Sequence, residues 1–313
     1  MMKNWLAAGA FALTAGMTAT AAQAQTTTVP GEQVGLATGA PLPEGVYAIN
    51  TFTYRSQDNA AVDTAVNIPI LLWSTPWTPF GGRIELAVAP PTVFTFSRAA
   101  GGRDTSINVG TFIGGIWAFD LGGNIGVSVL FGTYLNELNA GRGGGLNILA
   151  SNTYRAGGAI SYTGDGWNLT ANLTYNFYDT PGRFDGPNGI PAFFGPVGIS
   201  DALNLDLTAT KKFGKFEIGA IGYGTVNLDP NAITFPAGLG VLGSRVGRGG
   251  RFALGGLIGY DFGPFTVQAY VARDVVTSAG VSESTDGWFR IIAPLYTPAP
   301  AAAPAPAPLV RKY

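Results

Sequence analysis

The sequence predicts an all-β protein, a transmembrane antiparallel up-and-down β-barrel of about 12 strands. Three observations lead to this prediction. Segments of about ten residues alternate apolar and polar side chains, as in a strand with one lipid-facing and one inward-facing side. Short and long connections alternate between these segments, and aromatic residues flank both kinds of connection. Outer-membrane barrels combine short periplasmic turns, long external loops and aromatic girdles at both membrane interfaces.

The N-terminus has the features of a secretory signal peptide. Lys3 supplies a positive charge, residues 5–17 form an apolar stretch too short to span a bilayer, and residues 22–24 (Ala-Gln-Ala) fit the small-x-small cleavage rule. We therefore expect residues 1–24 to be a signal peptide that is removed after Ala24. We expect residues 25–45 to be a periplasmic N-terminal segment, which could alternatively fold into the barrel as a plug.

The barrel itself is expected over residues 46–296. Its clearest strand is 167–177, where every odd-numbered residue is apolar and every even-numbered residue is Asn or Thr. Pro69 does not fit a regular strand, because proline lacks the N–H that a closed barrel pairs; we expect a bulge there or a later strand start. The twelve strands are expected to begin near Val46, Val66, Gly82, Ile107, Asn124, Arg155, Gly166, Ala202, Lys215, Arg251, Pro264 and Asp286.

The connections fix which side of the membrane each strand end faces. Short turns are expected at residues 75–81, 120–123, 163–166, 212–214 and 261–263, and long loops at residues 56–65, 98–106, 134–154, 178–200, 226–250 and 275–285. An even number of strands places both ends of the barrel on the short-turn, periplasmic side. The tail 297–313 is rich in Ala and Pro, which favours polyproline II or disorder, and it could be a spacer, a recognition tail or a solvated end.

Aromatic residues are expected to form the two girdles. One group flanks the short turns: Trp73, Trp77, Phe80, Trp117, Phe119, Trp167, Phe213, Phe216, Tyr260, Phe262 and Phe265. The other group lies near the long loops: Tyr54, Phe131, Tyr134, Phe177, Tyr178 and Tyr223.

Composition excludes many enzyme classes. The chain has 313 residues, 18 Lys and Arg, 19 Asp and Glu, and neither His nor Cys. Without His and Cys there is no Ser-His or Cys-His nucleophile, no thiolate and no His- or Cys-ligated metal. A net charge of −1 argues against a nucleic-acid partner. We therefore expect no enzymatic activity, no cofactor and no metal.

Two motifs resemble ligand sites but lack the required context. The glycines at 238, 240 and 243 match a dinucleotide fingerprint, yet they fall in an expected loop rather than between a strand and a helix. Asp58, Asp63, Asp179 and Asp185 could bind calcium at loop tips, but their spacing favours turn residues.

Polar residues on the inward-facing sides of the strands are the candidate lumen lining. They are Asn50, Arg83, Glu85, Asn168, Asn172, Asn176, Asn204, Asp206, Thr208, Glu217, Gln268 and Arg290. Fewer than half are charged and many are amides, which suits neutral or amphipathic solutes better than an ion filter. A second cluster, Arg245, Arg248 and Arg251, is expected in an extracellular loop, where it would contact lipopolysaccharide phosphates, attract acidic solutes or simply be solvated.

Several segments resemble one family of outer-membrane proteins. Residues 70–77 (Ile-Leu-Leu-Trp-Ser-Thr-Pro-Trp), followed by residues 80–82 (Phe-Gly-Gly), resemble a segment of the "MetA-pathway of phenol degradation" family. Residues 45–54 resemble the first strand of that family, and residues 203–206, 211–216 and 221–223 resemble a later hairpin. The resemblance implies an outer-membrane transporter associated with the catabolism of aromatic compounds.

The expected function is passive passage of small, hydrophobic or aromatic molecules through a narrow, polar-lined lumen in the bacterial outer membrane. The alternatives are a structural or adhesin-type barrel with a closed pore, and an outer-membrane lipid-modifying enzyme with an unusual Asp or Lys base. The expected partners are outer-membrane lipid and lipopolysaccharide, a small solute and the barrel-assembly machinery.

Overall fold

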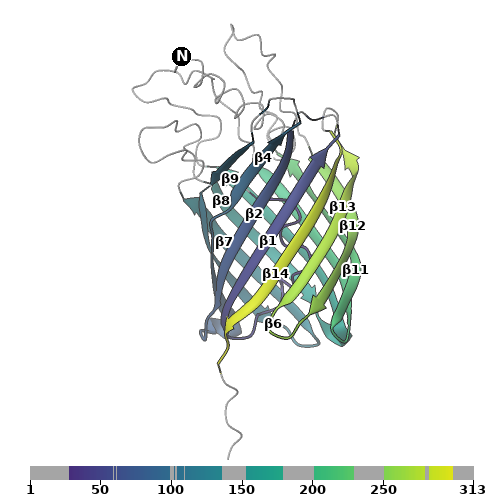
Figure 1. Ribbon diagram of the computed structural model, residues 1–313. Coiled ribbons are helices and arrows are strands. Elements are labelled where there is room, and N and C mark those ends of the chain that lie inside the picture. The colour runs from purple at the N-terminus through teal and green to yellow at the C-terminus, as the bar shows by residue number, and fades with distance from the viewer. Residues whose placement is uncertain are drawn as a thin grey trace, which may run out of the picture.

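The structure, a computed structural model, describes residues 28–58, 60, 62–98, 102, 104–108, 110–135, 153–178, 201–228, 250–278 and 282–298. These residues form one antiparallel sheet that closes into a barrel with tilted strands (Figure 1). No helix among the described residues is long and apolar enough to cross a membrane. The predicted signal peptide, most of the tail and the centres of three expected long loops (136–152, 179–200 and 229–249) lie outside the described residues.

Twelve strands make the closed ring, as predicted. They are β1 (Gly45–Gln57), β2 (Val62–Ser74), β3 (Arg83–Ala89), β6 (Thr111–Asp120), β7 (Ile125–Leu135), β8 (Thr153–Tyr162), β9 (Trp167–Tyr178), β10 (Ala202–Phe213), β11 (Phe216–Asn227), β12 (Gly250–Asp261), β13 (Thr266–Thr277) and β14 (Ser284–Tyr296). Each strand pairs with its neighbours along the ring, and β1 pairs with both β2 and β14. Closure matters because an unpaired sheet edge in lipid would leave backbone N–H and C=O groups without partners.

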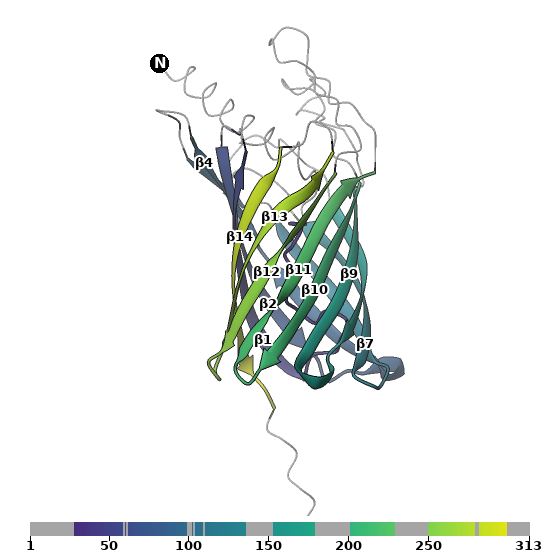
Figure 2. The ribbon, with the colours of Figure 1, turned by 90° about the vertical axis from the view of Figure 1, so that its right-hand side faces the viewer.

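Two further strands extend the sheet beyond the ring. β4 (Thr92–Ser97) continues the direction of β3 after Pro90 and Pro91, and β5 (Thr105–Asn108) precedes β6. β4 pairs with the first half of β2 and with β5, and it leans away from the barrel at the upper rim (Figure 2). The sequence patterns predicted one continuous strand at each place. Between β3 and β4 the prediction is wrong because alternation alone does not show that Pro90 and Pro91 interrupt a ladder.

Pro69 lies opposite this interruption, without the expected bulge or later strand start. β2 begins before the predicted residue, at Val62, and its register with β1 is continuous through the pair Asn50 and Pro69. On its other side, β2 pairs with β4 up to Asn67 and with β3 from Leu71 onward. Residues 68–70 therefore have no ladder partner on that side, so the proline coincides with a break in pairing.

The connections are less regular than predicted. Residues 58–61 join β1 to β2 where a long loop was expected, because the alternating pattern of both strands continues into residues 56–65. The connection 75–82 on the opposite rim is longer and contains the short 3₁₀ helix η1 (Pro79–Gly81). A second 3₁₀ turn, η2 (Gly164–Gly166), joins β8 to β9. Strict alternation of short and long connections is therefore wrong for the first hairpin.

The two faces of the wall differ in the way a membrane requires. In β9, Leu169 and Leu173 are 42% and 50% exposed on the outside, whereas Thr170 and Asn172 are both 6% exposed and point inward. Apolar side chains outside bury their surface in lipid. Aromatic side chains at the short-turn rim are also exposed, among them Trp73, Trp77, Phe80, Phe213, Phe216 and Phe262. Tyr134 and Tyr223, expected in the opposite girdle, are instead buried inside the barrel.

The barrel interior as candidate functional site

Residues 28–44 lie inside the barrel; we call them the inner segment. Near the long-loop rim, the Thr28 hydroxyl donates to the side-chain oxygen of Asn176 at 2.6 Å. At the short-turn rim, the Leu42 amide donates to Glu85 at 2.8 Å, and the Ser74 hydroxyl donates to the Leu42 carbonyl at 3.0 Å. The inner segment therefore runs down the interior and turns into β1 at Gly45, with its upper part on the long-loop side.

Asp206 on β10 holds the middle of the inner segment. Its two carboxylate oxygens accept the amides of Gly31 at 2.8 Å and Gln33 at 3.1 Å. Thr208, two residues along the same face, accepts the amide of Gly35 at 2.8 Å. Backbone N–H groups that leave water need such acceptors, so the polar face of β10 replaces the hydration of the inner segment.

Side-chain donors from neighbouring strands satisfy the carbonyls. Asn168 and Gln268 each donate to the Gly35 carbonyl at 3.1 Å, and Asn172 donates to the side-chain oxygen of Gln33 at 2.7 Å. Arg290, which is fully buried, donates to the carbonyls of Val34 and Glu32. These side-chain amides and the buried guanidinium are thus paired with the inner segment rather than with bulk water.

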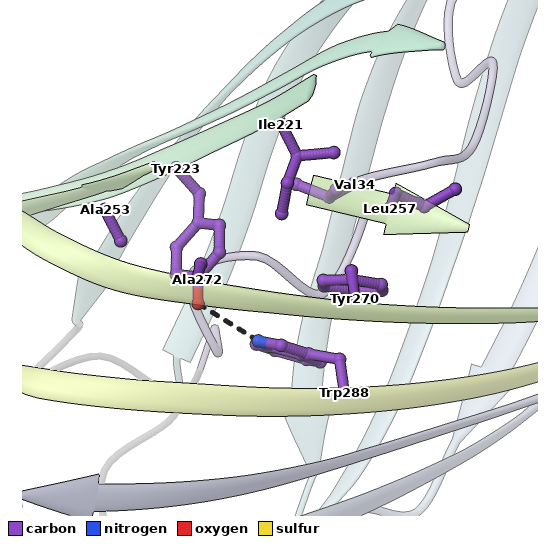
Figure 3. Close-up of a cluster of buried hydrophobic side chains, with 8 residues drawn as sticks. All are labelled: Val34, Ile221, Tyr223, Ala253, Leu257, Tyr270, Ala272 and Trp288. Atoms are coloured by element: carbon purple, nitrogen blue, oxygen red, sulfur yellow. Dashed lines mark hydrogen bonds between the residues drawn. The ribbon is translucent and has the colours of Figure 1, made fainter. Parts of the chain in front are cut away.

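One apolar side chain anchors the inner segment to the same wall. Val34 is fully buried against Ile221, Leu257 and the rings of Tyr270 and Trp288 (Figure 3). The Tyr270 and Trp288 rings stack with centroids 5.2 Å apart, and the Trp288 indole N–H donates to the Tyr223 hydroxyl at 3.0 Å.

Gly31 and Gly35 flank this anchor with φ of +98° and +83°. A Cβ at Gly35 would lie 2.8 Å from Leu257 Cδ1, so glycine is needed there for both conformation and space.

A cavity of about 570 Å³ remains on the opposite side of the interior. It lies between the inner segment and the wall formed mainly by β1, β2, β3, β6 and β7, and its volume is typical of small-molecule sites. Most of the wall side chains that line it are apolar: Tyr47, Ile49, Ile68, Ile70, Leu72, Ala87, Ala89, Phe112, Ile116, Leu130 and Tyr134. The interior therefore has two sides, a polar wall covered by the inner segment and an apolar wall facing a cavity.

Arg155 on β8 is the buried cation of this cavity. Its guanidinium donates to Glu32 of the inner segment at 2.6 Å and to the Tyr134 hydroxyl at 2.6 Å. The guanidinium carbon lies 4.8 Å from the centre of the Phe112 ring. Its Nε is buried and has no hydrogen-bond partner among the described residues.

A separate ion-pair cluster lies inside the barrel near the long-loop rim. Asp286 on β14 accepts from Arg55 of β1 at 2.9 Å and from Arg251 of β12 at 2.6 Å. Arg251 also pairs with Asp274 of β13 at 3.2 Å. Arg251 is therefore buried in the wall rather than in an extracellular loop, because the strand pattern of β12 begins one residue before it. Arg245 and Arg248 lie outside the described residues.

The structure places the predicted lumen residues in different surroundings. Eight contact the inner segment: Glu85, Asn168, Asn172, Asn176, Asp206, Thr208, Gln268 and Arg290. Glu217 is buried and accepts from Thr210 and Gln268. Asn204 is buried, and its side-chain amide has no hydrogen-bond partner in the part of the chain that the structure describes. Arg83 is half-buried and donates to the Thr75 carbonyl.

Asn50 is the exception, because it lies on the outer face. The inward-facing residues of β1 are Tyr47, Ile49 and Thr51, and Asn50 is exposed and donates to Asn67 of β2 at 3.0 Å. The rule that polar residues face inward fails here because β1 and β2 carry apolar side chains on both faces. For the same reason the sequence analysis did not predict the apolar lining of the cavity, although strands with apolar residues on both faces can be recognised in the sequence.

The aspartates weighed as calcium ligands take part in ion pairs where they are described. Asp58 pairs with Arg273, which holds the pKa of Asp58 below its usual range, and Asp63 pairs with Arg98. Asp179 and Asp185 lie outside the described residues. Within the described part of the chain, no group of three or more acidic side chains is placed to hold a metal.

The structure is similar to solved structures of outer-membrane barrels. The COG4313 outer membrane channel from Pseudomonas putida F1 aligns with a TM-score of 0.60 and 13% identity, over 85% of this chain and 99% of that one. A FadL homologue from Pseudomonas aeruginosa has a TM-score of 0.47 and 9% identity, over 86% and 99% of the two chains. The translocator domain of the autotransporter NalP from Neisseria meningitidis has a TM-score of 0.48 and 10% identity, over 80% and 89%.

The sequence comparisons agree with the resemblance noted above. A search of the curated proteins finds no match. The closed barrel, its apolar outer face and its structural similarity to the COG4313 outer membrane channel place the chain in the bacterial outer membrane. The family described as "MetA-pathway of phenol degradation" matches residues 43–291, which is most of the chain. The chain therefore belongs to the "MetA-pathway of phenol degradation" family.

Proposed function

We propose that this protein is an outer-membrane channel for small hydrophobic or aromatic molecules, and that solutes occupy the apolar cavity beside the inner segment. The observation that carries this proposal is the cavity itself, which has a mainly apolar wall and lies inside a membrane barrel. A polar-lined pore, as the sequence indicates, would bind such solutes poorly. Here the chain's own residues 31–35 are bonded to the polar wall, and most of the wall surface left free between β1 and β7 is apolar.

Passage through the interior requires the inner segment to shift. It fills one side of the lumen and is hydrogen-bonded from Thr28 to Leu42. We propose that the inner segment controls passage and that the external loops contact lipopolysaccharide, with the barrel-assembly machinery inserting the protein. The alternative, an adhesin-type barrel with a closed interior, makes the cavity irrelevant to uptake.

The test locks the inner segment to the wall. The Ser128 hydroxyl donates to the Thr38 carbonyl at 2.7 Å, which brings the two residues side by side, and the double variant Thr38→Cys with Ser128→Cys is oxidised and its disulfide verified by mass spectrometry. The chain has no cysteine of its own, so the bond is unique. In cells lacking the native gene, we expect the wild-type protein to accelerate uptake of the neutral fluorescent aromatic N-phenylnaphthylamine. Uptake of the probe by cells with the oxidised double variant should be slow, and a reductant that breaks the disulfide should restore the rate of uptake.

The two single-cysteine variants are the matched controls and should behave like the wild type with and without reductant. If the wild-type protein does not accelerate uptake at all, the channel proposal fails and the adhesin alternative is favoured. If the oxidised and reduced double variants take up the probe equally fast, the inner segment does not control passage.

A further inference from the structure

We propose that the cavity recognises aromatic carboxylates, with the anionic group on Arg155 and with Glu32 acting as the resident counter-ion that the solute displaces. This inference rests on the proposed function and adds the chemical class of the solute to it. It follows from an unusual combination in one place: a buried guanidinium, aromatic rings beside it, a free donor and an empty apolar volume.

The guanidinium is only partly used by the protein. Arginine presents five N–H donors in a planar fork that matches a carboxylate. Arg155 gives one nitrogen to Glu32 and one to the Tyr134 hydroxyl, while its Nε is buried without a partner among the described residues. A buried donor with no acceptor is costly, so an incoming carboxylate at the Nε edge would satisfy it.

The surroundings of Arg155 favour a planar apolar body attached to that anion. Phe112 and Tyr134 lie beside the guanidinium, with ring centres 4.8 Å and 5.3 Å from its central carbon. Both residues also line the cavity, together with Ile68, Ala89 and Leu130. A carboxylate bound to Arg155 would therefore project its ring into apolar space, where burial of the ring adds to the affinity.

Glu32 competes with the solute carboxylate for the guanidinium of Arg155. Its carboxylate contacts Arg155 at 2.6 Å and also accepts the amide of Val29 at 3.2 Å, so it belongs to the inner segment rather than to the wall. A second carboxylate at the same guanidinium would repel Glu32, because two anions would share one cation. Binding of the solute thus exchanges the counter-ion of Arg155 and removes the ion pair between this wall and the inner segment.

Binding of a matched pair of probes, benzoate and its neutral analogue benzamide, to the full-length protein in detergent tests this assignment by calorimetry. Glu32→Gln should raise the affinity for benzoate about tenfold or more, because the buried guanidinium then lacks its anion. The same change should alter benzamide binding less than about twofold, since benzamide carries no charge. Glu283→Gln is the control, because it removes the same charge from an exposed ion pair with Arg273.

Removing Arg155 alone could unfold the site, since it would leave Glu32 buried without a cation. The double variant Arg155→Gln with Glu32→Gln avoids this and should bind benzoate no better than benzamide. If benzoate and benzamide affinities change equally in Glu32→Gln, or if the double variant keeps a preference for benzoate, the assignment is wrong. Either result leaves the channel proposal standing, because uptake of a neutral aromatic probe is measured separately.

Discussion

At the scale of single residues, the interior depends on side chains that replace water for the inner segment. Asp206 is the clearest case, because one buried carboxylate accepts two backbone amides. A charged acceptor makes hydrogen bonds about twice as strong as a neutral one. Its strand pattern shows that Asp206 faces inward, but nothing in the pattern shows that it meets residues 31 and 33 of the same chain.

Asp206→Asn should loosen the inner segment without unfolding the barrel. The amide keeps the shape, but only its single oxygen can accept, so one of the two hydrogen bonds is lost and the other loses its charge-assisted character, a loss of about 1.5–3 kcal/mol. Hydrogen exchange measured by mass spectrometry should show faster exchange for residues 28–44. Asp261→Asn, in an exposed turn where it accepts the Gly263 amide, is the control and should leave exchange of residues 28–44 unchanged. Unaltered exchange in Asp206→Asn would show that Asp206 does not hold the inner segment.

Gly35→Ala should detach the inner segment more strongly than Asp206→Asn. The added methyl would lie 2.8 Å from Leu257 Cδ1, at a residue with φ of +83°. Both the conformation and the contact oppose alanine, so the inner segment should detach around Val34. Limited proteolysis of the folded protein should then cut within residues 28–44. Gly256→Ala, on β12 where a Cβ meets no atom closer than 3.8 Å, is the control and should resist cleavage; equal resistance in Gly35→Ala would contradict the packing argument.

At the scale of elements, the barrel wall is held by many more hydrogen bonds than the inner segment. Each of the twelve ring strands has neighbours on both sides, whereas residues 28–44 are held by scattered side-chain contacts and one apolar anchor. An element with few cooperative hydrogen bonds opens at lower free-energy cost than a paired strand. The inner segment is therefore the part of the interior that can move while the wall stays closed.

Deletion of residues 28–42 should open the lumen. The barrel begins at Gly45, so no strand is lost, and the polar wall and the apolar cavity would merge into one water-filled space. Single-channel conductance in planar bilayers should rise severalfold over that of the wild-type protein. The variant should still show the heat-dependent gel mobility of a folded barrel. A folded deletion variant with unchanged conductance would show that the inner segment does not occlude the pore.

At the scale of the whole molecule, closure joins the first strand to the last. β1 and β14 pair along their length, and the buried cluster around Asp286 ties β1, β12, β13 and β14 together inside that seam. Two arginines and two aspartates balance in charge, so the cluster carries no net charge. Breaking such a buried network costs much more than losing an exposed ion pair.

Asp286→Asn should destabilise the closed barrel. Arg55 and Arg251 would lose the anion between them, with a cost of about 3–5 kcal/mol, as is typical when one partner of a buried pair is removed. Urea unfolding in lipid vesicles, followed by tryptophan fluorescence, should show a lower free energy of unfolding. Asp58→Asn, which removes one acid from an exposed pair with Arg273, should leave the unfolding curve nearly unchanged. Equal stability of both variants would mean that the cluster does not secure the seam.

The sequence by itself determined the wall of this protein. Alternation in segments such as 167–177 depends only on which side chains can face lipid, so it predicted twelve ring strands, their outer face and their membrane. The local pattern gave the wrong face for Asn50, because β1 has apolar side chains on both faces. It also missed the start of β4, because alternation continues across Pro90 and Pro91.

Only the tertiary structure decided what fills the barrel. The contacts of Gly31, Val34 and Gly35 with Asp206, Trp288 and Gln268 join residues far apart in the chain, and no local periodicity encodes such pairings. The same is true of Arg155 and Glu32, whose meeting depends on how the inner segment crosses the closed barrel. Strand patterns report the environment of each face, whereas the identity of an interior partner is fixed only when the sheet has closed around it.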